Sequence, residues 1–246
     1  MKKKYTLLLL LPLLFTSCSD SPYDDFVYAN EGYIKLEGSS LELDNITDLT
    51  VDWINGSISC VQGNSSLLSF SESTSDYPLY YRIIDNSLTI KVAESGTSSR
   101  VISNLNKDLT LTVPSLFNGL NIEAIKTKVE IKNEFTIKDG TFSMVDASLV
   151  IDHYRSAKTA FNLVNVPLTI NHLDIDKDKN YSSTSLNIVN RNATIGIKEE
   201  NGYHIDWSGV NSTFASEYED EKDYGDHKVR MGCKVVNGKV NIKKIA

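Results

Sequence analysis

Two histidines are spaced as the units of a repeat would space them. His153 follows Ile151 by two residues and His172 follows Ile170 by two residues, so the two imidazoles lie 19 residues apart at the same offset. If successive strands stack in register, these rings become neighbours on one face. Zinc uses three or four protein ligands, and the equivalent place one unit earlier is Asn133. We therefore interpret His153 and His172 as a pair of surface histidines, weak as metal candidates, and predict no metal site.

The segment DIDKDKN carries a second group of potential ligands. Oxygen-bearing side chains occupy alternate positions, namely Asp174, Asp176, Asp178 and Asn180. This spacing resembles the opening of a calcium loop, which needs Gly at its sixth position and a bidentate Glu at its twelfth. Lys179 and Ser185 stand at those positions. We interpret the segment as a solvated loop, with Asp174, Asp176 and Asp178 as weak cation candidates.

The segment DYPLYYR brings several tyrosines together. Exposed tyrosine rings can stack on sugars or on a partner protein, which makes Tyr77, Tyr80 and Tyr81 weak binding candidates. Strand alternation would place Tyr80 and Tyr81 on opposite faces, so at least one of them is expected in the core.

Catalytic signatures are missing from the sequence. It has no Gly-x-Ser-x-Gly elbow, no His-Glu-x-x-His motif and no phosphate-binding glycine loop. We predict no enzyme activity and no cofactor. Because carboxylates are plentiful, a polysaccharide-active enzyme is a minor alternative.

Strands, rather than helices, must position these side chains. Segments such as YIKLEG, LTVDWI, SLTIKVA and KVNIKK alternate apolar and polar residues with a period of two, the pattern of a sheet with one buried face. Asn-Gly pairs at 55–56, 118–119, 201–202 and 237–238 separate such segments and suit type I′ turns. The sequence therefore predicts an all-β fold.

The middle of the chain repeats a short strand, a polar kink and a second strand ending in Ile, in segments 120–131, 142–151, 161–170 and 186–195. Phe142 and Phe161 are 19 residues apart, as are Ile151 and Ile170. Units spaced by roughly 20 residues are typical of a β-solenoid, in which each unit buries its apolar face only by stacking on its neighbours. The aligned Phe and Ile residues would form inner columns, and the longer 170–186 connection would loop out. A β-sandwich is the alternative.

The N-terminus has the pattern of an export signal. Three lysines precede an apolar core from Leu7 to Phe15, which is followed by Thr16, Ser17 and Cys18. The Phe-Thr-Ser-Cys ending resembles the lipobox of bacterial lipoproteins, in which a peptidase cuts before a cysteine that is then acylated. The resemblance implies a signal peptide over 1–17, a lipidated Cys18 with a flexible acidic tether over 18–32, and a folded domain over 33–246.

Charge and anchor together indicate a location. Removal of residues 1–17 takes away three lysines and no acid, so the formal charge changes from −7 to −10. A charge of this sign argues against a nucleic-acid partner, which needs a basic surface. We predict an exported protein held at the outer membrane by its lipid, facing the periplasm or the cell surface. Cys60 and Cys233 remain, as buried free thiols or as one disulfide.

Three stretches resemble a known group of proteins: DNSLTIKV (85–92), KDLTLTVPSLFNGLNIEAI (107–125) and VVNGKVNIKK (235–244). They are similar to the bacterial "putative adhesin" domain built from β-strand repeats and common in Bacteroidetes lipoproteins. The resemblance implies a single-stranded, right-handed β-solenoid. It also implies a non-catalytic cell-envelope or surface protein with adhesin-like binding of a protein or glycan. The alternative function is that of a β-sandwich lipoprotein resembling fimbrial subunits or glycan-uptake accessories.

Overall fold

The computed structural model describes residues 27–28, 32–75, 77–92, 100–101, 106–176, 178–218 and 222–245. The predicted lipidation site Cys18 and nearly all of the predicted tether lie outside these residues. All regular elements of the described part are strands, which confirms the all-β prediction. Within the same residues there is no helix with the length and apolarity that a membrane crossing requires.

The strands follow one another in the order β1 (Val27–Tyr28), β2 (Ile34–Lys35), β3 (Ser40–Leu41), β4 (Asp48–Gly63), β5 (Leu68–Glu72), β6 (Leu79–Ile84), β7 (Ser87–Val92), β8 (Arg100–Val101), β9 (Lys107–Pro114), β10 (Gly119–Val145), β11 (Ser148–Val164), β12 (Leu168–Ile175), β13 (Ser182–Val189), β14 (Ala193–Lys198), β15 (Tyr203–Val210), β16 (Thr213–Ser216), β17 (Asp223–Tyr224), β18 (Val229–Val236) and β19 (Lys239–Ile245). The pair β1 and β8 forms a small sheet of its own, and the other strands belong to one large sheet.

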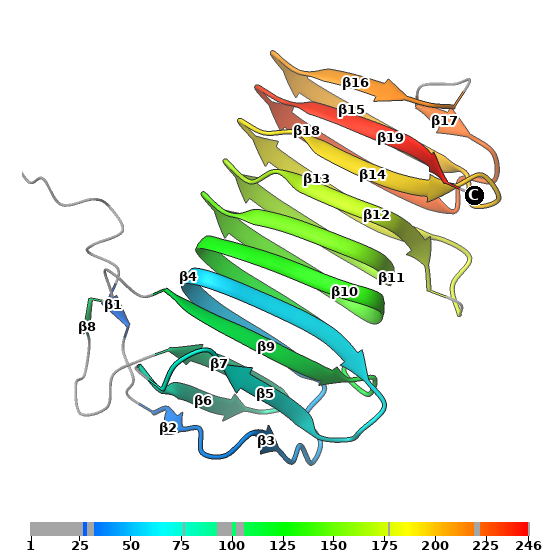
Figure 1. The fold of residues 1–246 in the computed structure, drawn as a ribbon. Coiled ribbons are helices and arrows are strands. Elements are labelled where there is room, and N and C mark those ends of the chain that lie inside the picture. Colours follow the sequence, from blue (N-terminus) through cyan, green and yellow to red (C-terminus); the bar gives the residue numbers. More distant parts are fainter. Residues whose placement is uncertain are drawn as a thin grey trace, which may run out of the picture.

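Parallel strands stacked in two layers make up most of the structure (Figure 1). The first layer contains β7, the 48–54 part of β4, the 119–125 and 139–145 parts of β10, the 158–164 part of β11, and then β13, β18 and β15. The second layer contains β9, the 56–63 part of β4, the 127–137 part of β10, the 148–156 part of β11, and then β12, β14, β19 and β16. The long strands β4, β10 and β11 therefore cross from one layer to the other.

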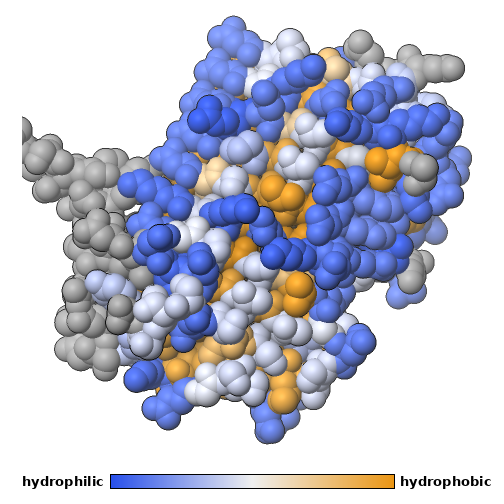
Figure 2. Space-filling view, in the orientation of Figure 1, coloured by the Kyte–Doolittle hydropathy of each residue, from blue (hydrophilic) through white to orange (hydrophobic). Residues whose placement is uncertain are grey.

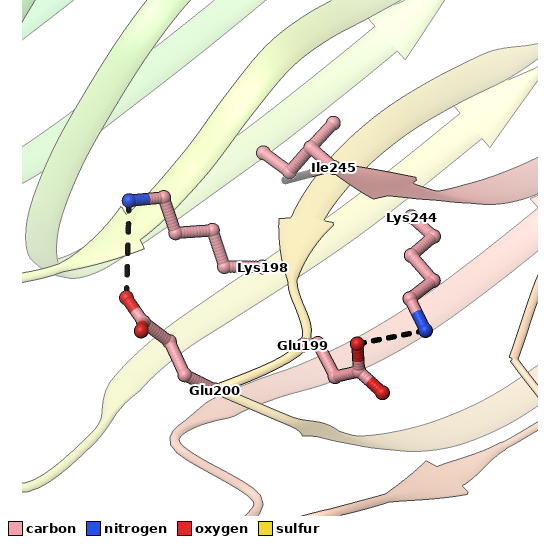
Figure 3. A pocket seen from close by; sticks show the side chains of 5 residues that line it. All are labelled: Lys198, Glu199, Glu200, Lys244 and Ile245. Carbon is pink, nitrogen blue, oxygen red and sulfur yellow. Dashed lines mark ion pairs between the residues drawn. The ribbon is translucent and has the colours of Figure 1, made fainter.

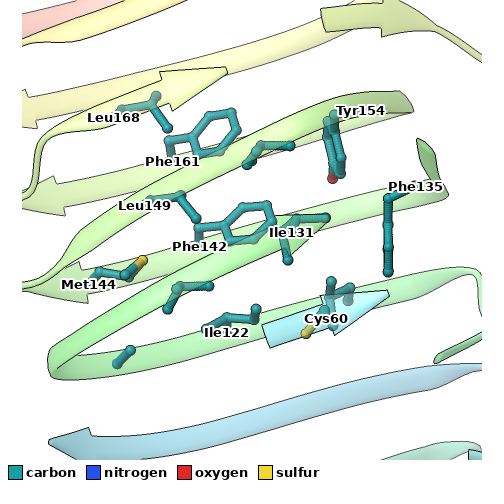
Figure 4. Close-up of a cluster of buried hydrophobic side chains, with 14 of the residues drawn as sticks. Cys60, Ile122, Ile131, Phe135, Phe142, Met144, Leu149, Tyr154, Phe161 and Leu168 are labelled. Atoms are coloured by element: carbon teal, nitrogen blue, oxygen red, sulfur yellow. The ribbon is translucent and has the colours of Figure 1, made fainter. Parts of the chain in front are cut away.

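Equivalent side chains form buried columns between the layers. Phe142 pairs with Phe161, and their rings stack with centroids 5.1 Å apart (Figure 4). In the second layer one column contains five isoleucines in succession, namely Ile131, Ile151, Ile170, Ile195 and Ile242. The predicted Phe and Ile columns are thus confirmed. Each such side chain contributes about 1.5–3 kcal/mol to the stability of the fold when it leaves water. On the surface, hydrophobic residues form a band along the stack (Figure 2).

The first layer ends at a corner that seven of the described levels make with a residue of positive φ. The corner residues have positive φ and are Asn55, Lys126, Asp146, Asn165, Asn190, Asn237 and Asn211. Asn and Asp tolerate this left-handed conformation better than other residues with a Cβ, because their short side chains bond locally. Their amides also bond along the stack, from Asn165 Nδ2 to Asp146 Oδ1 (2.6 Å), from Asn190 to Asn165 (3.1 Å) and from Asn237 to Asn190 (3.1 Å). We call this row the corner ladder.

The Asn-Gly pairs do not form the hairpins that type I′ turns would make. At Asn55 and Gly56 both φ angles are positive, but the two flanking parts of β4 lie in different layers. A side chain at position 56 would also collide with Lys107, since an added Cβ would lie 2.0 Å from its carbonyl oxygen. The pair therefore turns a corner between layers. The two-residue hairpin between β6 and β7 uses Asp85 and Asn86 instead.

The order of the strands departs from the order of the chain near both ends of the stack. The last strands, β18 and β19, lie between the earlier pairs: β18 separates β13 from β15, and β19 separates β14 from β16. Similarly, β4 lies between β10 on one side and β7 and β9 on the other. Antiparallel strands β5 and β6 pair with β9 and β7. The loop expected at 170–186 is shorter than predicted, because β12 continues to Ile175 and β13 starts at Ser182.

Candidate functional site

An apolar groove crosses the outer surface of the first layer. It has a volume of about 480 Å³ and is lined by Asp52, Glu123, Ala124, Ile125, Ser143, Met144, Val145, Asn162, Leu163, Val164, Asn187 and Val189. Val145, Val164 and Val189 lie beside one another in register across β10, β11 and β13. The same row continues beyond the groove through Val236 of β18 to Val210 of β15. We call the groove the valine groove.

These valines face outward, where a sheet normally carries polar side chains. Val164 is 39% exposed, Val236 is 37% exposed and Val210 is 62% exposed. They lie immediately before the corner ladder, so the corner geometry fixes their direction and spacing. A contiguous row of exposed β-branched side chains costs hydration free energy, and such patches mark interaction sites in soluble proteins.

Polar groups border the valine groove on both sides. Asn187 donates a hydrogen bond of 2.8 Å from Nδ2 to Oδ1 of Asn162, and Asp52 and Glu123 place carboxylates at one end. On the other side, the corner ladder follows directly after the valines in the chain. None of the described lining residues is aromatic. The groove therefore offers an apolar floor with hydrogen-bonding edges.

Sequence reasoning missed this groove, although the signal was present. Five levels end the first-layer strand with Val followed by Asp or Asn, in MVD (144–146), LVN (163–165), IVN (188–190), GVN (209–211) and VVN (235–237). The Val faces out because the next residue turns the corner.

The second candidate site is a cluster around His153 and His172, the two histidines that the repeat spacing predicted to be neighbours. His153 and His172 pair in register on β11 and β12, and their rings stack with centroids 3.9 Å apart and planes 3° from parallel. The prediction that they are stacked neighbours is confirmed. Asp174 joins them: its Oδ2 lies 3.5 Å from His153 Nε2 and 3.9 Å from His172 Nε2. All three side chains are largely buried, with exposed fractions of 20%, 19% and 13%.

Irregular pairing aims these side chains outward. Between Ile170 and Leu173, two residues of β12 oppose Gly196 alone on β14, which makes a β-bulge at His172. Another register shift on β10 brings Glu134, not Asn133, beside His153. The sequence comparison that assigned Asn133 to this place was wrong, because it could not see the extra residue.

Hydrogen bonds and charge hold Asp174 in position. Its Oδ1 accepts from the Ile175 backbone N–H (2.9 Å) and from Asn201 Nδ2 (2.9 Å), and Arg155 Nε approaches its Oδ2 at 3.3 Å. Arg155 also contacts Glu134 at 2.6 Å. Burial acts to raise the pKa of Asp174, but these hydrogen bonds and the guanidinium together lower it below its ordinary value. The carboxylate is ionised at neutral pH.

The imidazole of His172 is uncharged near neutral pH. Burial lowers the pKa of His172, and the neighbouring His153 lowers it further, against the opposing pull of Asp174. The Nε2 atoms of His153 and His172 are both buried and form no hydrogen bond in the described part of the chain. Each ring thus points an unsatisfied nitrogen toward the Asp174 side.

The remaining cation candidates do not gather around Asp174. Asp176 forms a local turn, in which its Oδ1 accepts from the Asp178 backbone N–H at 3.1 Å. Asp174 instead lies beside the two histidines. The aspartates that suggested a calcium loop therefore do not surround one common point, because Asp176 and Asp178 form a separate turn.

The tyrosine candidates lie at the other end of the stack. Tyr80 is 4% exposed and belongs to the core. Tyr77 and Tyr81 are partly buried and pack against that core. Tyr77 also accepts a hydrogen bond of 2.7 Å from Lys107 Nζ through its backbone oxygen. The three rings therefore do not form one exposed platform.

A charged hollow of about 670 Å³ lies at the ends of β14 and β19 (Figure 3). Lys244 Nζ lies 2.7 Å from Glu199 Oε2, and Lys198 Nζ lies 3.8 Å from Glu200 Oε1. Because lysine and glutamate neutralise each other in both pairs, we assign the hollow no binding role.

Comparison with known proteins gives distant structural likenesses. No protein-family model matches the chain, and no curated protein matches it. One similar solved structure is described as a "putative cell adhesion protein" from Clostridium sporogenes, with 12% identity, 89% of this chain and 98% of that chain covered, and a TM-score of 0.41. Another is a "putative adhesin" from Bacteroides fragilis, with 12% identity, 91% and 99% covered, and a TM-score of 0.34. At these scores neither likeness bears on function.

Proposed function

We propose that the chain is a non-catalytic, adhesin-like protein of the cell surface, which binds an extended apolar segment of a partner protein along the valine groove. The observation that carries this proposal is the in-register row of Val145, Val164 and Val189 on the floor of the groove. Burial of such a row on binding recovers the hydration free energy that its exposure costs.

A protein segment fits the groove better than a sugar does. Glycan recognition relies on aromatic rings that stack on sugar faces, and the described lining is aliphatic. The tyrosines that could have formed such a platform are packed against the core. An extended peptide can place alternate side chains on the valines and bond its backbone to Asn162, Asn187 or Glu123 at the border.

We also propose that the two-layer stack is a β-solenoid, with β-sandwich as the alternative. The proposal is supported by parallel pairing at a near-constant offset, since Phe142, Phe161 and Leu186 occupy one column. The repeated positive φ at the corner ladder supports it too, because the levels that carry these residues turn alike.

A lipid on Cys18 would hold this domain at the outer membrane. The support is the lipobox-like sequence alone. Cells fed labelled palmitate should incorporate it into the wild-type chain and not into the Cys18→Ser variant, which should also leave the membrane fraction. Equal labelling of both chains would remove the anchor from the account.

Selection from a displayed random-peptide library tests the groove itself. The immobilised Cys18→Ser chain should enrich peptides with alternating apolar residues, and Val164→Asp should weaken their binding at least 10-fold. Val150→Asp is the matched control, because Val150 is a partly buried valine of the same strand in the second layer. Equal loss in both variants, or enrichment no better than on empty beads, would contradict the proposal.

A further inference from the structure

We propose that His153, His172 and Asp174 form a binding site for a divalent transition-metal ion of the zinc class. One nitrogen from each imidazole and one carboxylate oxygen lie within 4.8 Å of one another. The cluster uses no residue of the valine groove, so this proposal stands independently of the proposed function.

The distances are close to those of a formed site. Tetrahedral zinc with bonds of about 2.0–2.1 Å places its ligand atoms roughly 3.4 Å apart. Asp174 Oδ2 already lies 3.5 Å from His153 Nε2 and 3.9 Å from His172 Nε2. The nearly parallel rings must tilt so that both nitrogen lone pairs converge on one ion. The bulge at His172 gives its ring a less constrained setting than a regular strand would.

The unsatisfied Nε2 atoms of the two histidines also point to a bound ligand. Buried polar atoms are nearly always hydrogen-bonded, and an unpartnered one costs about 1–3 kcal/mol. His153 Nε2 and His172 Nε2 are both buried without a hydrogen bond, on adjacent strands and facing the same carboxylate. An ion bound between them would satisfy both nitrogens at once.

The carboxylate is oriented as metal ligands usually are. Asn201 and the Ile175 backbone N–H hold Oδ1 of Asp174, which leaves Oδ2 directed at the imidazoles. Such outer hydrogen bonds fix ligand orientation in known metal sites. They also tie β12 to the segment after β14, so a bound ion would connect β11, β12 and that segment.

The ligand set selects the class of ion. Two imidazoles and one carboxylate suit zinc, nickel or copper, whereas calcium and magnesium prefer oxygen ligands alone. Three protein ligands leave a fourth position for water. Glu134 lies at the other ring nitrogen of His153, 3.8 Å from Nδ1, and stays with Arg155. The thiols do not compete, because Cys60 and Cys233 are buried in the core.

Arg155 opposes the ion. Its guanidinium lies 3.3 Å from Asp174 Oδ2, and a metal ion must displace this contact while Arg155 keeps Glu134. Removal of the positive charge should therefore strengthen metal binding. This effect has the opposite sign to ligand removal, so general destabilisation cannot imitate it.

The test is zinc titration of the full chain carrying Cys18→Ser, purified without a histidine tag and followed by calorimetry and thermal unfolding. We expect one ion per chain and a rise in the unfolding temperature. His172→Gln should weaken binding at least 10-fold, and Arg155→Gln should tighten it. His227→Gln, in the protein's other histidine pair, is the control and should bind as the wild type does.

Two results would overturn the proposal: no heat and no thermal shift with zinc in the wild type, or loss of binding in His227→Gln with retention in His172→Gln. Should His172→Gln fail to fold, ring-nitrogen NMR of the wild type decides. Zinc must then shift the Nε2 signals of His153 and His172, and shifts confined to the other histidines would refute the site.

Discussion

Asn190 donates a hydrogen bond of 3.1 Å from its side-chain Nδ2 to Oδ1 of Asn165, one level away, and both residues have positive φ. The same residue thus makes the corner at its own level and bonds to the corner residue of the neighbouring level. Because the outward valine precedes each of these residues, the corner ladder is what presents the valine groove.

Replacement of Asn165 by Ala should lower the free energy of unfolding by about 1–2 kcal/mol, because a residue with a plain Cβ is strained at φ 57° and the ladder loses its hydrogen bonds. Asn165→Gly should cost less, since Gly adopts this φ without strain. Urea unfolding measures both. A glycine variant less stable than the alanine variant would show that backbone strain is not the cause.

Phe161 should be among the most sensitive positions of the core. It is fully buried and stacks on Phe142, so Phe161→Ala should cost about 3–5 kcal/mol of unfolding free energy. Phe214, on the strand at the end of the stack, is only partly buried, and the same substitution there should cost clearly less. Denaturant midpoints that moved equally in the two variants would argue against the columns as the source of stability.

Much of this architecture could be predicted from the sequence. Alternation gave the all-β class, and the 19-residue spacing placed Phe142 on Phe161 and His153 on His172. These inferences succeed because side-chain direction in a strand has a period of two and equivalent positions stack.

Other features could not be predicted. The sequence does not show that β18 inserts between β13 and β15. These three strands all end in Val-Asn, so their sequences do not specify which strand is whose neighbour. Glu134 joined His153 through a bulge, which adds one residue without any mark in the spacing. Asp174, in contrast, follows His172 by two residues on β12, so strand alternation alone puts both on one face.

The cysteines should resist thiol reagents in the folded protein. Cys60 and Cys233 are free and buried, and burial raises the pKa of each thiol to about 12, with Asp206 adding to the effect at Cys233. The Cys18→Ser chain should show almost no reaction with a disulfide reagent at pH 8 and release two equivalents in guanidinium without reductant. Absence of those equivalents would reveal a disulfide.

His204 should make stability depend on pH. Its hydrogen bond with Asp223 raises its pKa, and the nearby Asp223 and Asp206 charges add to this. A raised folded pKa means that the contribution is fully present below the unfolded value of about 6.5 and is lost as pH rises through the folded pKa. The same hydrogen bond lowers the pKa of Asp223. The stabilisation by the pair is therefore also lost in acid, as pH falls through the folded pKa of Asp223.

The check is an NMR titration of His204 in the wild type and in Asp223→Asn. The midpoint should fall in the variant, and the difference in unfolding temperature between the two proteins should be larger at pH 5.5 than at pH 8.5. An unchanged midpoint would show that Asp223 does not control this histidine.

Protease treatment of intact cells tests the surface-binding account most directly, with an antibody following the chain and a periplasmic protein as the control. The account predicts that proteinase K removes the signal while the periplasmic control survives, and that permeabilised cells lose both. Survival of the chain on intact cells, with cleavage only after permeabilisation, would place the valine groove inside the envelope and contradict the adhesin-like role.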